Sequence, residues 1–260
     1  MRLGSKTAFI TGGTSGIGFA TAEAFVRHGA FVAITGRDRK RLDEAVARIG
    51  NACVGFVADV SDDDAMRTAL RATAERSGGI DIVFANAGHY VHSALGHTTR
   101  KELEDQLSVV TGIFMTVQLS LPHLRDGASV ILMGSVYATM GPPGAGAYAA
   151  SKAASAALAR SMASELSPRG IRVNVIVPGA VDTPSWAMDG WEPTVRDERK
   201  KRLGERAPLN RMITAAEVAN AAVFLASDES SGVQASEIVV DGGTTGALAG
   251  SPRYMREENS

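Results

Sequence analysis

The sequence is short of cysteine, of long apolar runs and of net charge, and each shortage excludes a class of protein. Its single cysteine, Cys53, cannot form an internal disulfide, and no second ligand stands near it at a metal-site spacing. No apolar run approaches the length that spans a bilayer, which argues against a membrane protein. The formal net charge of −1 gives no electrostatic reason to expect nucleic acid or an anionic membrane as a partner.

The beginning of the chain also lacks the apolar core of a secretory signal. Residues Met1–Lys6 lead within a few positions into a β-rich run, so we expect a cytoplasmic protein. Hydrophobic residues make up 45% of the chain and charged residues 21%, as in ordinary globular proteins. A length of 260 residues suffices for one large α/β domain with a substantial core.

What the sequence does contain is a regular alternation of short apolar runs and longer helical patterns. Near-continuous apolar runs are typical of parallel strands that are covered on both faces. We therefore predict an α/β fold: a doubly wound, Rossmann-type parallel sheet of about seven strands, with helices on both faces and a single domain over residues 1–260. The predicted strands are Thr7–Ile10, Phe31–Thr35, Cys53–Ala58, Ile80–Ala85, Ser129–Met133, Arg172–Val177 and Glu237–Val240.

Several helix ends are marked by capping residues. His28-Gly29 closes the first helix, and Ser61, followed by acidic residues, predicts a helix start. Thr99 and Thr214 each precede a glutamate by three residues, the spacing of a capping box. Two segments stand outside the alternation: an insertion over residues 184–211 and a polar tail over residues 247–260.

A glycine-rich turn, residues 11–18, sits between the first strand and the first helix. Gly12 permits a tight turn, Gly16 lets the backbone approach a pyrophosphate, and Gly18 allows helix and strand to pack closely. Phosphates would meet the free N–H groups at the start of the helix. The pattern TGxxxGxG in this strand–turn–helix context predicts nucleotide binding.

A second pattern carries chemistry. Tyr148 and Lys152 are four residues apart in an Ala-rich helical stretch, which places them on one helical face. An ammonium beside a phenol lowers the pKa of the phenol, so Tyr148 is a candidate general acid or base. Ser135 precedes Tyr148 by thirteen residues; it is a candidate catalytic hydroxyl or, alternatively, a strand-end capping group.

The ordered set of motifs resembles the short-chain dehydrogenase/reductase family over about residues 5–245. The resemblance rests on TGxxxGxG, on Asn86-Ala87-Gly88, on Ser135 with Tyr148-x-x-x-Lys152, on Pro178-Gly179 and on Asp241-Gly242-Gly243. It implies a nicotinamide cofactor, reversible interconversion of carbonyl and alcohol, and a homo-oligomer, usually a tetramer. Enoyl reductases of this family separate tyrosine and lysine more widely, so the resemblance favours C=O over C=C reduction.

The resemblance also assigns roles to single residues. Ser135 would bind the substrate oxygen, Tyr148 would transfer the proton, and Lys152 would hold the nicotinamide ribose and lower the pKa of Tyr148. Asp59 would flank the adenine, but it is alternatively a strand-end residue without a role in binding. The expected cofactor-binding set is Gly12, Thr14, Ser15, Gly16, Ile17 (pyrophosphate), Gly18, Arg37, Asp59 and Val60 (adenine), Asn86 (adenosine ribose), Gly88, Tyr148, Lys152, Pro178, Gly179, and Val181 and Thr183 (nicotinamide carboxamide).

The end of the second strand favours NADP over NAD. An NAD binder needs an acidic residue there for the ribose hydroxyl, but this chain has Gly36 followed by Arg37. A guanidinium suits the 2′-phosphate of NADP, which it grips with two donors. Asp38 is the residue that would favour NAD instead, whereas Arg39–Arg41 read as the solvated face of the next helix.

One family residue is missing. The resemblance places an asparagine in the helix before the fifth strand, where it supports a water chain to the lysine, but this chain has Val109. Asp105 and Gln106, one turn earlier, are possible stand-ins. An alternative function is therefore an NADP-binding redox sensor or scaffold with impaired turnover.

The sequence predicts where a substrate binds but not which substrate it is. A small carbonyl or alcohol is expected to contact His89–His92, Val136–Ala147 and the insertion after Pro184. Trp186, Met188 and Trp191 make the start of that insertion apolar, as in a lid. His89 and His92 read as incidental loop histidines and receive no catalytic role.

Overall fold

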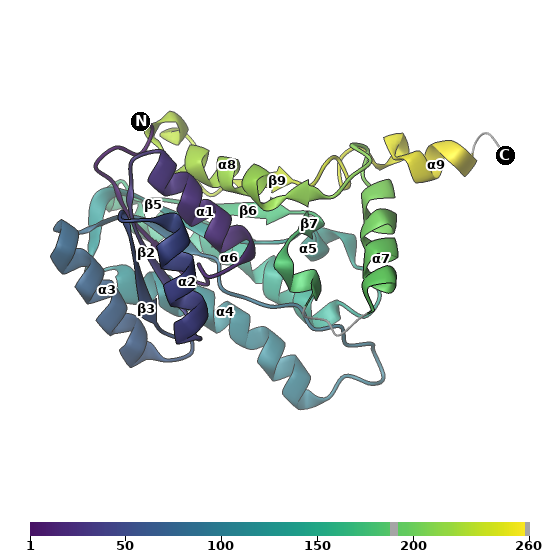
Figure 1. Cartoon of the computed structure of the whole chain (residues 1–260), viewed down its shortest axis with the longest axis horizontal. Coiled ribbons are helices and arrows are strands. Elements are labelled where there is room, and N and C mark those ends of the chain that lie inside the picture. Colours follow the sequence, from purple (N-terminus) through teal and green to yellow (C-terminus); the bar gives the residue numbers. More distant parts are fainter. Residues whose placement is uncertain (188–191, 258–260) are drawn as a thin grey trace.

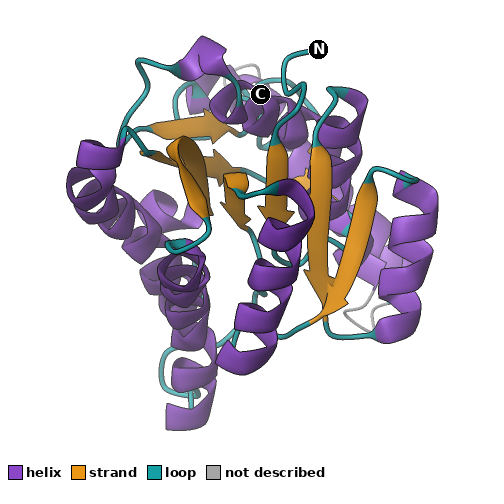
Figure 2. Ribbon diagram, turned by 90° about the vertical axis from the view of Figure 1, so that its left-hand side faces the viewer, coloured by secondary structure: helices purple, strands orange, loops and turns teal. Residues whose placement is uncertain are grey.

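A sheet of parallel strands organises the computed structural model, which describes residues 1–187 and 192–257 (Figure 2). The strand order is β3-β2-β1-β4-β5-β6-β9, so the predicted fold class is confirmed. The strands are β1 (Thr7–Ile10), β2 (Phe31–Gly36), β3 (Cys53–Val57), β4 (Ile80–Ala85), β5 (Leu124–Met133), β6 (Arg172–Pro178) and β9 (Glu237–Val240). The largest difference from the prediction is in β5, which begins at Leu124 rather than Ser129.

Helices cover both faces of this sheet (Figures 1 and 2). Alternate strand residues point to opposite faces, so in β1 Ala8 and Ile10 join one core cluster while Phe9 joins the other. The first cluster lies under α1 (Gly16–Arg27), α2 (Arg39–Ile49) and α8 (Ala215–Ala226). The second lies under α3 (Asp63–Ser77), α4 (Arg100–Ser120) and α6 (Gly146–Leu166). Burial on both faces explains why the strands read as continuous apolar runs.

The helix ends follow the capping residues, with one correction. Thr99 and Thr214 form complete capping boxes with Glu102 and Glu217, as predicted. The N-cap of α3 is Asp62, not Ser61, because the Asp62 carboxylate accepts from the backbone N–H groups of residues 64 and 65. No helix in the two described ranges has both the length and the apolar character needed to cross a membrane.

Further elements outside the main sheet and the six covering helices complete the chain. They are α5 (Tyr137–Met140), η1 (Ser167–Arg169), β7 (Val181–Asp182), η2 (Pro184–Ala187), α7 (Pro193–Glu205), β8 (Ile213–Thr214), η3 (Asp228–Ser230), η4 (Leu248–Gly250) and α9 (Pro252–Glu257). β7 and β8 pair with each other outside the main sheet, so they brace both ends of the predicted insertion. The predicted tail contains α9, which projects away from the sheet (Figure 1).

Candidate active site

The predicted site residues gather at one edge of the sheet. β1, β4, β5 and β6 are neighbours and run parallel, so their carboxyl ends meet at the same edge. The glycine-rich turn follows β1, Asn86 follows β4, Ser135 follows β5, and Pro178 ends β6. In open α/β sheets this edge is where ligands bind.

The glycine-rich turn has the backbone shape that phosphate binding requires. Gly12 and Gly16 have φ values of +66° and +57°, which residues with a Cβ rarely adopt. A Cβ on Gly18 would overlap the carbonyl oxygen of Gly12, so only glycine lets α1 pack this close to the turn. The N-cap Ser15 makes no side-chain bond to α1, and the first turn holds no acidic residue. The first N–H groups of α1 are therefore suited to an anion, and a dinucleotide fits these residues.

Asn86 locks this turn to the end of β4. Its carboxamide nitrogen donates to the carbonyl oxygens of Thr11 (2.9 Å) and Gly12 (3.3 Å). In return the Thr11 hydroxyl oxygen accepts from the backbone N–H groups of Asn86 and Ala87, each at 3.0 Å. Four bonds thus join the turn to the next strand in the sheet, which explains why both motifs occur together.

The end of β2 presents a guanidinium to solvent. The side chain of Arg37 is 83% exposed, and its Nε lies 3.7 Å from the Asp59 carboxylate. Asp38 instead caps α2, because its Oδ1 accepts from the backbone N–H of Arg41 at 3.0 Å. Gly36 has no room for a side chain, since a Cβ there would overlap the methyl group of Thr14. Arg37 is thus the more accessible of the two charged groups that follow Gly36.

Asp59 and Val60 lie where β3 leads toward α3. Burial alone would raise the pKa of Asp59, but hydrogen bonds from the backbone and hydroxyl of Ser61, with the nearby Arg37, lower that pKa overall. The carboxylate is therefore ionised at neutral pH. Val60 packs against α4 at Gly112, where an added Cβ would come within 2.7 Å of Val60 Cγ2. Both expected adenine neighbours thus also have structural contacts.

Ser135 and Tyr148 are brought together by β5 and α6. Their side chains are hydrogen-bonded, and the Ser135 oxygen also accepts from the backbone N–H of Tyr137 at 3.2 Å. Burial raises the pKa of Tyr148, the Ser135 hydrogen bond partly offsets that rise, and the neighbouring Tyr137 and Tyr90 add to it. The pKa of Tyr148 is thus shifted upward, not downward as expected, and the groups that shift it are Ser135, Tyr137 and Tyr90 together with burial rather than Lys152.

Lys152 lies on α6 close to Tyr148 but is directed to the sheet. It is 4% exposed, and its Nζ donates to the carbonyl oxygen of Met133 at 3.1 Å. The Nζ is 5.7 Å from the centroid of the Tyr148 ring. Burial lowers the pKa of Lys152 to about 8. Ser155, one turn further along α6, donates to the same carbonyl oxygen at 3.2 Å.

Val109 occupies the place of the family asparagine beside this lysine. A Cβ on Gly88 would lie 3.2 Å from Val109 Cγ1 and 3.4 Å from Lys152 Nζ, so both side chains border the same small space. The proposed stand-ins are engaged elsewhere. Asp105 pairs with Lys101 on the surface at 2.7 Å, and the Gln106 carboxamide bonds the backbone of the loop after β4.

The segment after β6 returns to the glycine-rich turn. A Cβ on Gly16 would lie 3.5 Å from the Thr183 methyl group, which places Thr183 next to the phosphate cradle. Val181 is buried, and its carbonyl oxygen accepts from the Trp186 indole at 2.8 Å. Gly179 must lack a side chain because a Cβ would come within 2.8 Å of Asp241. The other two apolar residues of the predicted lid, Met188 and Trp191, lie outside the described residues.

Sequence reasoning named the loops around Tyr148 but missed two aromatic contacts there. Tyr90 and Tyr137 both pack edge-to-face on the Tyr148 ring. Each lies within a range that the sequence analysis expects to contact substrate. An aromatic residue in such a range is the sequence feature from which these contacts could have been predicted. The acceptor of Lys152 was not foreseeable, because a backbone carbonyl leaves no mark on the sequence.

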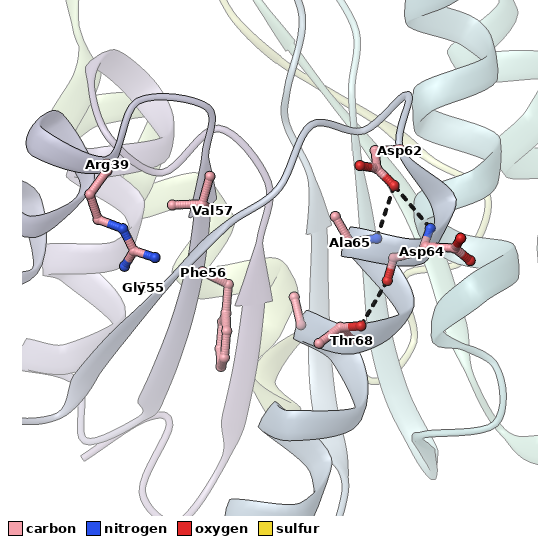
Figure 3. A pocket seen from close by; sticks show the side chains of 9 residues that line it. Arg39, Gly55, Phe56, Val57, Asp62, Asp64, Ala65 and Thr68 are labelled. Carbon is pink, nitrogen blue, oxygen red and sulfur yellow. Dashed lines mark hydrogen bonds between the residues drawn. The ribbon is translucent and has the colours of Figure 1, made fainter.

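A separate open groove lies beside the edge strand β3 (Figure 3). Its acidic residues are engaged in the start of α3: Asp62 accepts from the backbone of residues 64 and 65, and the Asp64 carbonyl accepts from Thr68. None of the proton-transfer candidates lines it. The lining residues are Arg39, Gly55, Phe56, Val57, Asp62, Asp64, Ala65, Thr68 and Ala69.

Comparison with known proteins places the chain in a family. Residues 12–245 match the family model described as Enoyl-(Acyl carrier protein) reductase. The chain is 41% identical to Oxidoreductase asL5 of Sarocladium schorii, over 93% of this chain and 96% of that protein. It is 37% identical to the NADP-dependent (R)-specific alcohol dehydrogenase of Lentilactobacillus kefiri, over 94% and 98%.

A solved structure agrees with these sequence matches. The apo structure of a short-chain oxidoreductase of Pseudomonas aeruginosa PAO1, described as containing an atypical catalytic center, has a TM-score of 0.88 and 32% identity, covering 95% of this chain and 99% of that one. The protein belongs to the short-chain dehydrogenase/reductase family, as the motifs indicated, and it is an oxidoreductase.

Proposed function

We propose that the protein is an NADP-dependent oxidoreductase that interconverts a ketone or aldehyde with the corresponding alcohol. The observation that carries this proposal is the close placement of the pair Ser135 and Tyr148 beside the buried Lys152, whose Nζ lies 5.7 Å from the centroid of the Tyr148 ring. This pair lies at the same sheet edge as the glycine-rich turn. A proton donor next to a dinucleotide site suits carbonyl reduction.

The three side chains would divide the work of proton transfer. Ser135 would donate a hydrogen bond to the substrate oxygen, and Tyr148 would deliver its proton to that oxygen. The raised pKa of Tyr148 keeps the phenol protonated at neutral pH, which suits the reducing direction. Lys152 would hold the ribose next to the nicotinamide. When bound, the nicotinamide supplies the hydride to the carbonyl carbon, or takes it from the alcohol.

The cofactor would lie along the carboxyl edge of the sheet, over the turn that Asn86 holds in place. Gly12, Gly16 and Gly18 leave room for the pyrophosphate, and Thr183 approaches the cradle from the segment after β6. The remaining residues proposed to bind it are Thr14, Ser15, Ile17, Arg37, Asp59, Val60, Asn86, Gly88, Tyr148, Lys152, Pro178, Gly179 and Val181.

The choice of NADP over NAD rests on the end of β2. Arg37 is 83% exposed, with only a long 3.7 Å contact to Asp59, and would meet a 2′-phosphate, whereas the Asp38 carboxylate is engaged in the cap of α2. The relative from Lentilactobacillus kefiri is NADP-dependent, which supports the choice. Arg37→Asp should lower kcat/KM for NADPH relative to NADH by about 10- to 100-fold, as expected for a lost charge-assisted bond. An unchanged ratio would contradict the proposed cofactor.

The function is tested by reduction of a panel of ketones and aldehydes with NADPH, followed as loss of cofactor absorbance. At least one carbonyl should be reduced by the wild type, and Tyr148→Phe should abolish that turnover while still binding NADPH. Tight NADPH binding without reduction of any carbonyl would favour a second candidate, a cofactor-binding sensor or scaffold. That candidate is supported by Val109, which cannot hold a water beside Lys152.

We also propose that the protein is a homo-oligomer, with a tetramer as the expected form. α4 carries Leu103, Leu107 and Phe114 at helical spacing, and their exposed fractions are 40%, 37% and 42%. Large apolar residues gathered on one helix face are typical of interfaces. Light scattering of the purified protein would reveal the assembly, and a monomer at micromolar concentration would refute this proposal.

A further inference from the structure

A buried glutamine fixes the loop between β4 and α4. Gln106 of α4 is 1% exposed, and its Oε1 accepts from the backbone N–H of Val91 at 3.0 Å. Its Nε2 donates to the carbonyl oxygen of His89 at 2.9 Å. The two backbone groups flank Tyr90 in sequence, so a single side chain holds the loop on both sides of that tyrosine. A buried amide with both ends satisfied fixes its partners firmly.

The same loop is tied to the segment before α6. The backbone N–H of Ser93 donates to the carbonyl oxygen of Gly144 at 2.8 Å. The His92 ring packs directly on Gly144, where an added Cβ would overlap the imidazole and where φ is +73°. The loop is thus held from α4 on one side and from the segment leading to Tyr148 on the other.

These anchors bring three tyrosine rings together around the proposed proton donor. The Tyr90 and Tyr148 centroids are 5.1 Å apart with an interplanar angle of 81°. Tyr137 lies 5.9 Å from Tyr148 at 88° and 6.0 Å from Tyr90 at 80°. Tyr90 remains 42% exposed, so this cluster reaches the surface of the protein. Each pair has the edge-to-face geometry that aromatic rings prefer.

We propose that Tyr90 and Tyr137 form an aromatic wall that selects substrates with an aromatic ring next to the reacting carbonyl or alcohol carbon. This inference rests on the proposed function, which places the substrate oxygen at Ser135 and Tyr148. A ring attached to that carbon then lies within reach of the two flanking tyrosines. A saturated ring of equal size buries the same surface but offers no quadrupole for edge-to-face pairing.

Gln106 is the positioning residue of this wall. It touches neither the substrate nor the reacting atoms and acts only through the backbone on either side of Tyr90. Replacing it with leucine keeps its approximate size but removes both bonds to the loop. The selectivity of the site, rather than proton transfer, should then be affected.

The test compares acetophenone with cyclohexyl methyl ketone, which differ in the aromaticity of the ring. Binding of each ketone to the protein saturated with NADPH is measured by calorimetry, and kcat/KM for each is measured separately. The wild type should bind acetophenone about threefold to tenfold more tightly, as expected for one or two aromatic pairs. Equal binding of the two ketones would overturn the inference, whether or not either is reduced.

Variants test whether Tyr90 and Tyr137 cause the preference for acetophenone. Tyr90→Leu and Tyr137→Leu should each reduce the ratio of the two affinities, whereas Tyr90→Phe, which keeps the ring, should retain it. Gln106→Leu should also reduce the preference for acetophenone, and in the kinetics the change should appear mainly in KM rather than in kcat. The double variant Gln106→Leu/Tyr90→Leu should have the same affinity ratio as Tyr90→Leu alone. Additive effects would show that Gln106 does not act through Tyr90. Thermal denaturation identifies variants that have lost the fold.

Binding and turnover separate the two proposals. An aromatic preference in binding without reduction of either ketone supports the wall and contradicts the proposed reaction. Reduction of both ketones with equal kcat/KM and equal affinity supports the reaction and contradicts the wall.

Discussion

The two ends of the central sheet differ in the partners of their buried charged side chains. At the amino ends of the strands, Asp81 of β4 accepts from the backbone N–H of Thr7 at 2.7 Å and from Arg125 at 2.6 Å. Arg125 also donates to the carbonyl oxygen of Ser77. Arg172, at the start of β6, donates to the carbonyl oxygens of Leu225 and Ser227 at the end of α8. Here Asp81 and Arg125 form an ion pair, Arg172 is held by backbone carbonyls, and both arrangements join neighbouring elements.

At the carboxyl ends, the candidate site holds two buried ionisable groups, Lys152 and Tyr148. Among the residues that the structure describes, no carboxylate forms a salt bridge with Lys152, whose only recorded bond is to the Met133 carbonyl. Burial lowers the pKa of Lys152 to about 8 and raises that of Tyr148. Burial thus shifts the pKa of Lys152 toward neutral pH and the pKa of Tyr148 away from it. Perturbed ionisable groups next to the glycine-rich turn are typical of a functional site, which makes the carboxyl end the candidate for chemistry.

The largest effect should come from removing the phenolic hydroxyl at the carboxyl end. Tyr148→Phe should lower kcat for carbonyl reduction by about 10²- to 10⁴-fold, the usual contribution of a general acid. The wild-type rate of reduction should also fall as the pH rises through the pKa of Tyr148, because the phenolate has no proton to donate. Steady-state kinetics across pH measure both effects. Activity that persists in the phenylalanine variant would remove Tyr148 from the mechanism.

The buried lysine should make stability depend on pH. Burial lowers its pKa to about 8 in the folded protein from the ordinary value of 10.5, so the unfolded chain binds more protons between these values. The free energy of unfolding should therefore rise with pH between about pH 8 and about pH 10, and this contribution is absent below about pH 8. Relative to Lys152→Met, the wild type should gain on the order of 2–3 kcal/mol over that window.

Urea unfolding of both proteins at the two ends of that pH window measures this difference. Lys40→Met, which removes an exposed lysine on α2, serves as the control and should show no comparable pH dependence. If the difference in the free energy of unfolding between wild type and Lys152→Met stays constant with pH, folding does not lower the pKa of Lys152.

At the amino end, breaking a pair should cost stability and leave kinetics unchanged. Arg125→Met leaves the partly buried Asp81 with only the Thr7 N–H, which should lower the free energy of unfolding by about 1–2 kcal/mol. Thermal or urea denaturation measures the loss, and kcat/KM should remain at the wild-type value. Arg71→Met, which breaks the exposed pair with Glu75, should change neither quantity. A kinetic defect in Arg125→Met would weaken the contrast between the two ends.

The smallest effect should come from restoring the family asparagine. Val109→Asn introduces a carboxamide beside Lys152, where it can hold a water, so kcat should rise a few-fold on any carbonyl that the enzyme reduces. Val110→Asn, the neighbouring position on α4, is the matched control and should give no rise. No change, or a fall, in Val109→Asn would indicate that protons reach Lys152 by another route.

Local patterns predicted most of the fold because they act over a few residues. The strands β1, β4 and β9 have the predicted bounds, and Thr99 and Thr214 cap their helices as their spacing indicated. The N-cap of α3 was misplaced by one residue because Ser61 and Asp62 are both good capping residues. β7 and β8 were missed, since strands of two residues carry no periodicity and form only because distant segments meet.

The site divides in the same way. The order of motifs along the chain was enough to name Ser135, Tyr148 and Lys152, because each motif sits at the end of a strand or the start of a helix. The direction of the Tyr148 pKa could not be read from the spacing to Lys152. It depends on how much protein surrounds the ring, and Tyr90 and Tyr137 reach it from different segments. Burial is a property of the whole fold.

The sequence by itself determined the parallel sheet and the glycine-rich turn, and it supplied the candidates for proton transfer, because hydrophobic periodicity and glycine geometry are local and short-ranged. Only the tertiary structure decided that Gln106 holds the loop around Tyr90, that Lys152 donates to a backbone carbonyl, and that Asp81 pairs with Arg125 at the amino end of the sheet. These features depend on which segments meet in space and how much water they exclude, and neither quantity is written in the order of the residues.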